Sequence, residues 1–170
     1  NSRRKLNDNE VMLPAAFIVC NQMKPVDGKP SCMTYGEVTT LFHEFGHAIQ
    51  HLLTKQDIEE VSGINGVEWD AVELASQFME NWVTRKEVLK DISEHVTTGE
   101  TLPDELIEKI KLYDHFRAAS GMQRQLNFGY MDMLLHSQYP SEKYQTIAAI
   151  EDEAARRFPR AKRIPNEHFL

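Results

Sequence analysis

Two histidines in the segment Leu41–His47 have the spacing of metal ligands. The segment reads Leu-Phe-His-Glu-Phe-Gly-His, so His43 and His47 are four residues apart and Glu44 directly follows the first of them. On a helix, side chains four residues apart project from one face, one turn above the other. Two imidazole nitrogens can then bind one Zn²⁺ while the glutamate stays free to act as a base. The pattern predicts a zinc site of the hydrolytic kind.

A catalytic zinc site needs a third protein ligand and one open position. We expect Glu73, 26 residues after His47, to be this ligand, because the glycine-bearing loop between them lets a second helix fold back along the first. Glu68 and Asp70 are the alternatives, and Glu73 would then be a solvated charge. If Glu73 is the ligand, Asp70 could accept a hydrogen bond from the free N–H of a ligating imidazole. It could also simply favour the helix N-terminus.

Glu44 is the predicted general base. It would take the proton of the water that attacks a peptide carbonyl and pass it to the leaving amine. His51, one further turn along the helix, is expected at the surface or in a cleft rather than as a ligand. The serines lack a G-x-S-x-G setting, and neither Cys20 nor Cys32 has a local catalytic signature, which argues against covalent nucleophilic catalysis.

The elements around the motif are expected to be mainly helical. A helix over about 34–54 begins at a capping box formed by Thr34 and Glu37 and carries apolar residues at helical spacing. Gly46 inside this helix costs about 0.8–1 kcal/mol relative to alanine, which predicts a close approach at this position, as beside a metal site. A second helix is expected over about 68–90, with one buried side: Trp69, Val72, Ala75, Met79 and Trp82.

The rest of the chain is expected to add further helices and one or two short strands. Residues 103–137 read as helical with a break near Ser120-Gly121, and 141–158 as one more helix. The apolar run 15–20 reads as a strand, either buried or an exposed edge, whereas 1–13 reads as a loop. No linker divides the sequence, so we expect a single domain over residues 1–170.

Composition excludes several classes of function. The formal net charge of −7 argues against nucleic acid and anionic membrane surfaces as partners. No apolar run is long enough to span a bilayer, and no signal-peptide pattern is present. The two cysteines lack CxxC spacing and are expected to be free thiols in a reducing compartment. We therefore expect a cytoplasmic or organellar protein that is not secreted and acts as a monomer.

The segment His43-Glu44-Phe45-Gly46-His47, followed by the segment 62–82, resembles the thimet oligopeptidase family of zinc metallopeptidases (family M3). The second segment reads Ser-Gly-Ile-Asn-Gly-Val-Glu-Trp-Asp-Ala-Val-Glu-Leu-Ala-Ser-Gln-Phe-Met-Glu-Asn-Trp, and the likeness is strongest to the oligopeptidase A branch. The resemblance implies a mainly helical, zincin-like catalytic core beside a deep channel that admits short peptides. It implies one zinc ion, with His43, His47 and Glu73 as ligands and Glu44 as general base.

Two parts of the family pattern are not matched in residues 1–170. These are a long helical N-terminal portion and a downstream segment rich in His, Tyr and Gly that contacts substrate. We therefore expect a catalytic-core fragment of a zinc endopeptidase for short oligopeptides. The alternatives are a peptidyl-dipeptidase of the same family, or a zinc-binding fragment without activity, because losing one oxyanion donor alone typically costs about 10²–10³-fold in rate.

Overall fold

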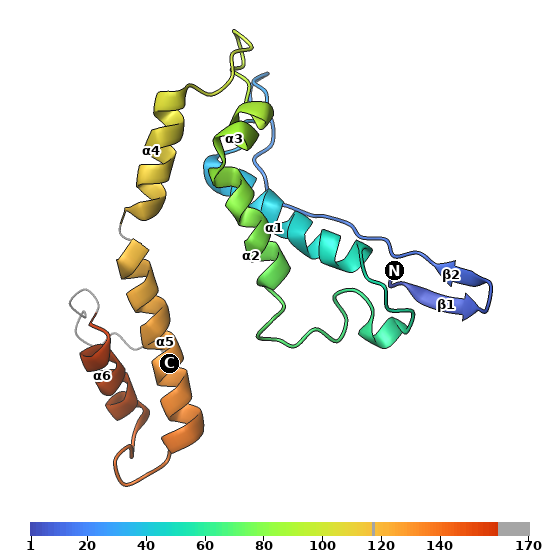
Figure 1. The fold of residues 1–170 in the computed structure, drawn as a ribbon. Helices are drawn as coiled ribbons and strands as arrows, with labels where there is room; N and C mark the ends of the chain where they lie inside the picture. The colour runs from blue at the N-terminus through green and yellow to red at the C-terminus, as the bar shows by residue number, and fades with distance from the viewer. Residues whose placement is uncertain (117, 160–170) are drawn as a thin grey trace. The chain divides into compact units, whose positions relative to one another are not determined.

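The computed structural model describes residues 1–116 and 118–159, which fold into two compact units. Unit 1 comprises Asn1–Ile110, and unit 2 begins at Lys111. The described residues are mainly helical with one two-stranded antiparallel hairpin, which confirms the predicted fold class (Figure 1). No described helix is both long and apolar enough to cross a membrane.

Unit 1 contains the hairpin and the helices around the HExxH motif. The strands are β1 (Arg4–Asn7) and β2 (Glu10–Met12), and the helices are α1 (Tyr35–Leu52), α2 (Leu74–Glu80) and α3 (Lys86–Ile92). Short 3-10 helices, η1 (Glu59–Val61) and η2 (Asn81–Thr84), lie in the connections. Helix α4 (Asp104–His115) begins in unit 1. The fully or nearly buried apolar side chains of this unit are few: Ala48, Val83, Leu89 and Ile107.

Helix α1 begins where the capping box predicted. The Thr34 hydroxyl accepts the Glu37 N–H at 3.2 Å, and the Glu37 carboxylate accepts the Thr34 N–H at 2.7 Å. These bonds satisfy two amides that the first turn of a helix leaves without partners. The capped helix packs against α2 (Figure 1).

The continuous helix predicted over about 68–90 is wrong. Residues 69–73 form turns, and the regular helix begins only at Leu74. After Glu80 the chain tightens into η2, where the Asn81 side-chain amide donates to the Phe78 carbonyl at 2.9 Å. Arg85 is then extended before α3 starts. The α-helical part of this segment is therefore short, and a local side-chain cap competes with its continuation.

The predicted buried side of that segment is also wrong at both tryptophans. Trp69 is 91% exposed because it precedes α2, and Trp82 is 42% exposed in η2. Leu74 and Phe78 of α2 are also exposed, so this helix carries apolar residues on its outer side as well as on the side that faces α1. The side of α2 that faces α1 centres on the fully buried Ser76.

The strand predicted for residues 15–20 does not form among the described residues. The segment has no strand assignment, and Phe17 and Val19 are 93% and 84% exposed. The hairpin lies instead in residues 4–12, which were expected to be a loop. A β-prone sequence forms a strand only when a neighbouring strand pairs with it, and β1 and β2 pair with each other.

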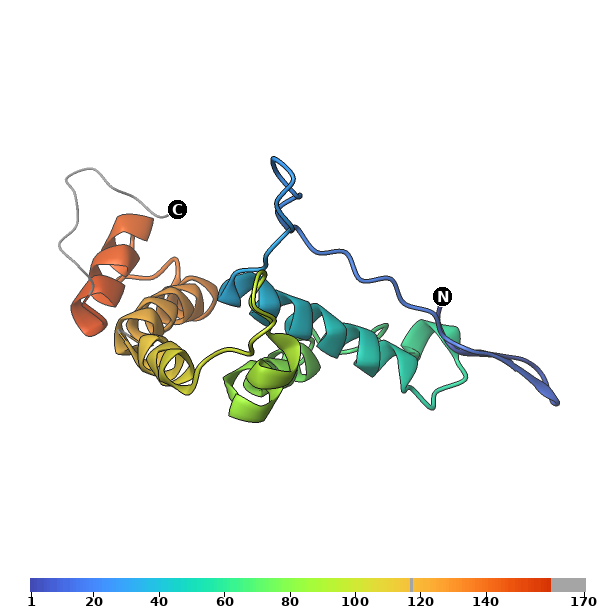
Figure 2. The ribbon, with the colours of Figure 1, turned by 90° about the horizontal axis from the view of Figure 1, so that it is seen from above.

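Unit 2 is built on two packed helices, α5 (Ala118–Gln138) and α6 (Ile147–Arg157), which lie side by side in both views (Figure 2). Their common core comprises Met131, Leu134, Tyr144, Ile150 and Ala154. The predicted helix break near Ser120-Gly121 is misplaced, because α4 ends at His115 and both residues lie inside α5. The helix predicted over 141–158 begins later, at Ile147, where the Thr146 hydroxyl accepts the Ala149 N–H at 3.2 Å.

Candidate metal centre

The three residues predicted as zinc ligands converge in unit 1. One ligand atom from each of His43, His47 and Glu73 lies within 4.8 Å of the other two. The Nε2 atom of His43 and the Nε2 atom of His47 each lie 3.1 Å from Oε2 of Glu73. We call these three residues the ligand group. It joins α1, which carries both histidines, to the residue that directly precedes α2.

The distances within the ligand group fit a zinc ion. Zinc binds imidazole nitrogen and carboxylate oxygen at about 2.0–2.2 Å, so ligand atoms at tetrahedral corners lie about 3.3–3.5 Å apart. The observed nitrogen–oxygen separations of 3.1 Å are close to this value. Two histidines and one carboxylate are also a known donor set of catalytic zinc, in which a fourth position stays open.

A glycine lets the two helices approach closely enough to form the group. A Cβ atom on Gly46 would lie 2.6 Å from the Ala75 carbonyl oxygen and 2.6 Å from the Ser76 Cα. The backbone of α2 therefore occupies the space of the missing side chain. This confirms the close approach that Gly46 predicted, at the turn of α1 that lies between His43 and His47.

Glu80 orients the first histidine. Its Oε1 lies 2.7 Å from Nδ1 of His43, a charge-assisted hydrogen-bond distance. A carboxylate at this nitrogen keeps the proton on Nδ1 and leaves the Nε2 lone pair free for a metal. Sequence reasoning missed this residue, although Glu80 follows Glu73 by seven residues, about two helical turns on the same face.

Asp70, for which the sequence left open either this role or a place at a helix N-terminus, does not contact the imidazoles. It is exposed in the turns before α2 and makes no hydrogen bond to either imidazole within the described residues. The expectation placed Asp70 on the same helical face as Glu73, but the helix starts only after Glu73. The Nδ1 atom of His47 is buried and has no hydrogen-bond partner among the described residues.

Ser76 holds the carboxylate of Glu73. The serine is fully buried, and its hydroxyl lies 2.7 Å from Oε2 and 3.0 Å from the backbone oxygen of Glu73, both of which can accept its proton. The hydrogen bond from Ser76, aided by the two nearby imidazoles, holds the pKa of the Glu73 carboxyl below its ordinary value. Glu73 is therefore kept in the ionised form that binds a cation.

The Glu44 side chain has no hydrogen-bond partner among the described residues, whereas both ring nitrogens of His51 have one. Glu44 is half-buried beside the first ligand, and its carboxylate joins no hydrogen bond or ion pair within the described residues. It is thus available to a substrate or a water molecule. Both ring nitrogens of His51 are occupied by backbone groups, and His51 does not belong to the ligand group.

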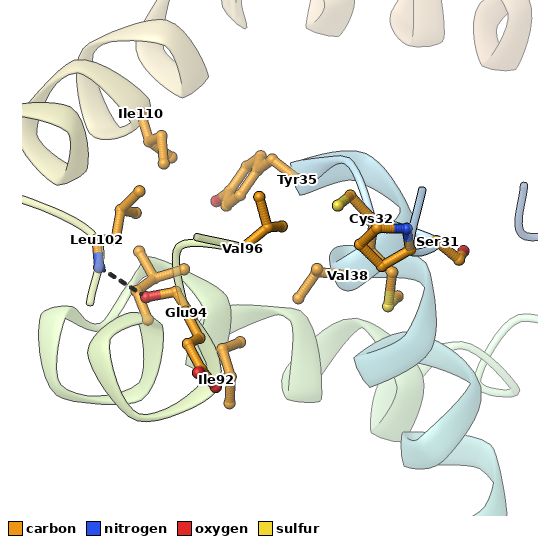
Figure 3. Close-up of a pocket in the computed structure, with 13 residues that line it drawn as sticks. Ser31, Cys32, Tyr35, Val38, Ile92, Glu94, Val96, Leu102 and Ile110 are labelled. Atoms are coloured by element: carbon orange, nitrogen blue, oxygen red, sulfur yellow. Dashed lines mark hydrogen bonds between the residues drawn. The ribbon is translucent and has the colours of Figure 1, made fainter. Parts of the chain in front are cut away.

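Unit 1 also contains an apolar cavity of about 480 Å³ between the start of α1 and α3 (Figure 3). Its lining includes Tyr35 and Val38 of α1 and Ile92 of α3, and the Ser93 hydroxyl at its wall accepts the Leu102 N–H at 2.9 Å. The lining includes no member of the ligand group. The cavity is therefore separate from the candidate metal centre.

Comparison with known proteins identifies the family. The model of peptidase family M3 matches residues 1–170. Organellar oligopeptidase A, chloroplastic/mitochondrial, of Arabidopsis thaliana is 47% identical over 162 residues, which are 95% of this chain and 20% of that protein. Oligopeptidase A of Haemophilus influenzae is 50% identical over 145 residues, 85% of this chain and 21% of that protein.

A more distant relative is the dipeptidyl carboxypeptidase of Salmonella typhimurium, 36% identical over 141 residues, 83% of this chain and 21% of that protein. The chain thus spans about a fifth of the length of the curated relatives it matches. Because the family match extends from the first residue to the last and includes the HExxH helix and Glu73, the chain belongs to peptidase family M3.

Proposed function

We propose that this protein provides the metal centre of a zinc-dependent endopeptidase that hydrolyses short oligopeptides. The observation that carries the proposal is the convergence of His43, His47 and Glu73 at zinc-ligand distances. Glu44, the residue after the first ligand, has a carboxylate that joins no hydrogen bond or ion pair within the described residues. We infer one zinc ion per chain, because His43, His47 and Glu73 form the one His/Cys/Asp/Glu group of suitable geometry among the described residues.

Each residue has a defined task in this proposal. A bound zinc ion supplies Lewis acidity, which activates water and polarises a peptide carbonyl. Glu44 accepts the proton of the attacking water at its carboxylate and delivers it to the amine nitrogen of the departing peptide. Glu80 keeps the His43 proton on Nδ1, and Ser76 keeps Glu73 ionised and oriented.

A peptidyl-dipeptidase is the second candidate, since the dipeptidyl carboxypeptidase of Salmonella typhimurium is 36% identical to this chain. The 47–50% identity to oligopeptidases A favours the endopeptidase. The two are separated by the products from a peptide blocked at both ends. An endopeptidase cuts it internally, whereas an enzyme that needs a free C-terminus leaves it intact.

The proposal extends to compartment and assembly. We place the protein in the cytoplasm or an organelle and not outside the cell. Among the relatives in Arabidopsis thaliana, one is named as chloroplastic/mitochondrial and another as a probable cytosolic oligopeptidase A. Free Cys20 and Cys32 are consistent with a reducing compartment. We propose that the protein acts as a monomer on short peptides.

The test uses a chimera, because the chain spans about a fifth of its relatives. The matching segment of Haemophilus influenzae oligopeptidase A is replaced by this chain, and zinc content and cleavage of a quenched fluorescent peptide are measured. We expect one zinc ion and turnover that a chelator abolishes. Glu44→Gln should retain zinc and lose activity by about 10²–10⁴-fold, whereas Glu105→Gln, an exposed control in α4, should change neither.

Four outcomes would contradict the proposal. The first is a chimera that binds no zinc although it folds. The second is full activity in Glu44→Gln. The third is activity that resists removal of the metal. Zinc binding without turnover in the chimera would show that this segment is a non-catalytic zinc module, which would also overturn the proposal.

A further inference from the structure

The last turn of α1 holds two distant segments of the chain through one histidine. The Nδ1 atom of His51 accepts the backbone N–H of Ile64 at 3.3 Å, and Nε2 lies 2.9 Å from the carbonyl oxygen of Asn1. A carbonyl oxygen can only accept, so Nε2 must donate and Nδ1 must carry the lone pair. A single neutral tautomer satisfies both contacts. We call His51 with these two backbone partners the latch.

Close packing against Gly63 adds to the hydrogen bonds of the latch. Gly63 has φ +68°, and a Cβ atom on it would lie 2.3 Å from Nδ1 of His51. The imidazole therefore packs directly on the glycine backbone. Both the left-handed conformation and the close contact require glycine at this position.

The N-terminal segment forms further contacts with the same loop. The Asn65 side-chain amide donates to the Ser2 hydroxyl at 2.7 Å, and Ser2 is buried. Arg3 forms an ion pair with Asp57 at 2.6 Å, and the Lys5 N–H donates to the Asp57 carbonyl at 2.8 Å. The loop 57–66 is thus attached to both α1 and the strand β1, which lies nearby in the fold (Figure 1).

This loop leads directly to the third member of the ligand group. From α1 the chain passes through 57–66, then through the turns at 69–73, and reaches Glu73 at the start of α2. Closing a loop costs entropy in proportion to the logarithm of its length. Without the latch, the loop that must close between His51 and Glu73 is about 22 residues long. With the latch, only about nine residues, from Ile64 to Glu73, remain free. The probability that Glu73 reaches the histidines is then about fourfold higher.

We propose that His51 is a positioning residue for the metal centre. By fastening the loop 57–66 to the helix that carries His43 and His47, it restricts where Glu73 can lie before the metal binds. The inference rests on the proposed zinc site and adds to it a residue that is not a member of the ligand group.

The test measures zinc affinity in variants of the full chain by competition with a chromogenic chelator. His51→Ala should weaken zinc binding about fourfold while the far-ultraviolet circular dichroism is retained. His51→Asn should restore most of the loss, because the Asn side-chain oxygen can accept the Ile64 N–H as Nδ1 does. His115→Ala, an exposed histidine at the end of α4, is the matched control and should bind zinc like the parent.

Two further measurements separate positioning from general destabilisation. The Co²⁺-substituted chain should change its visible absorption spectrum in His51→Ala, because the third ligand is less well fixed, and should recover the parent spectrum in His51→Asn. Gly63→Ala adds a Cβ atom that displaces the His51 ring from the loop, while the sequence of α1 is unchanged. It should therefore weaken zinc binding, as His51→Ala should.

The outcomes distinguish this inference from the proposed function. Failure of the parent chain to bind zinc would overturn the positioning role, and it would overturn the proposed function as well if the chimera also bound none. If the parent binds zinc and His51→Ala binds it equally well, the positioning role alone is overturned. Equal losses in His51→Ala and His51→Asn, or an unchanged Co²⁺ spectrum in His51→Ala, would also overturn the role.

Discussion

Replacing Gly46 by alanine tests whether the approach of α2 to α1 determines metal binding. The new Cβ would lie 2.6 Å from backbone atoms of Ala75 and Ser76, and ordinary contact begins at 3.4 Å. The obstructing atoms are backbone, which cannot rotate away as a side chain can. The helices must therefore separate by about 0.8 Å, since packed interiors have little free space to absorb the atom.

The expected effects on stability and on zinc differ in size. Alanine in a helix is favoured over glycine by about 0.8–1 kcal/mol, whereas overpacking costs about 1–3 kcal/mol. The metal-free chain with Gly46→Ala should therefore lose no more than about 2 kcal/mol. Zinc sites tolerate deviations of about 0.2 Å in the metal–ligand distance. Because Glu73 would move with α2 by more than this, zinc affinity should fall by at least about tenfold.

The assay combines thermal unfolding of the metal-free chain with chelator competition for zinc. Gly36→Ala is a control in the same helix, because a Cβ at Gly36 meets no atom within 4 Å. It should stabilise the chain by up to about 1 kcal/mol and leave zinc affinity unchanged. Parent-level zinc affinity in Gly46→Ala would refute the reasoning, since it would show that the ligand group forms without close helix contact.

Two further predictions concern carboxylates of unit 1. Glu80→Ala should weaken zinc binding about 10–100-fold in chelator competition by freeing the His43 ring, whereas Asp70→Ala should have no effect, and equal losses in both would contradict the assignment. Asp104 forms ion pairs with two lysines of α3, which lower its pKa from 3.8 to about 2. Its contribution to stability is therefore full above pH 3.8 and is lost as the pH falls toward 2. Thermal unfolding between about pH 4 and 2 should show that Asp104→Asn lacks this pH-dependent loss of stability. A pH profile of stability identical to that of the parent would contradict the prediction.

Helix α1 and the ligand group could be predicted because their signals are local. The capping box, the apolar spacing and HExxH all lie within one helix, where sequence distance determines direction in space. The chemistry of the third ligand predicted a carboxylate, and the position after the glycine-bearing loop and the family resemblance favoured Glu73 over Glu68 and Asp70. Gly46 predicted a close approach at its position, because glycine inside a helix lowers stability, and the approaching element is α2.

The remaining features depend on contacts that sequence spacing does not determine. Glu80 was overlooked because the predicted helix began too early and placed Asp70 on the ligand face. The run 15–20 has strand-forming side chains, but its conformation depends on pairing, and the described residues offer it no partner strand. The latch joins residues about 50 positions apart through backbone atoms, so no side-chain pattern marks it.

Because unit 1 has a small apolar core, a bound metal ion would also stabilise its fold, by acting as a reversible cross-link. A zinc ion bound by the ligand group would join residues 43 and 73 much as a disulfide joins two cysteines, but with a strength set by the free zinc concentration. A ligand at about 1,000 times its Kd adds about 4.1 kcal/mol to stability, against about 5–15 kcal/mol for a whole domain. Unit 2 has its own apolar core and no member of the ligand group. The melting temperature of unit 1 should therefore rise with zinc concentration, while that of unit 2 stays constant.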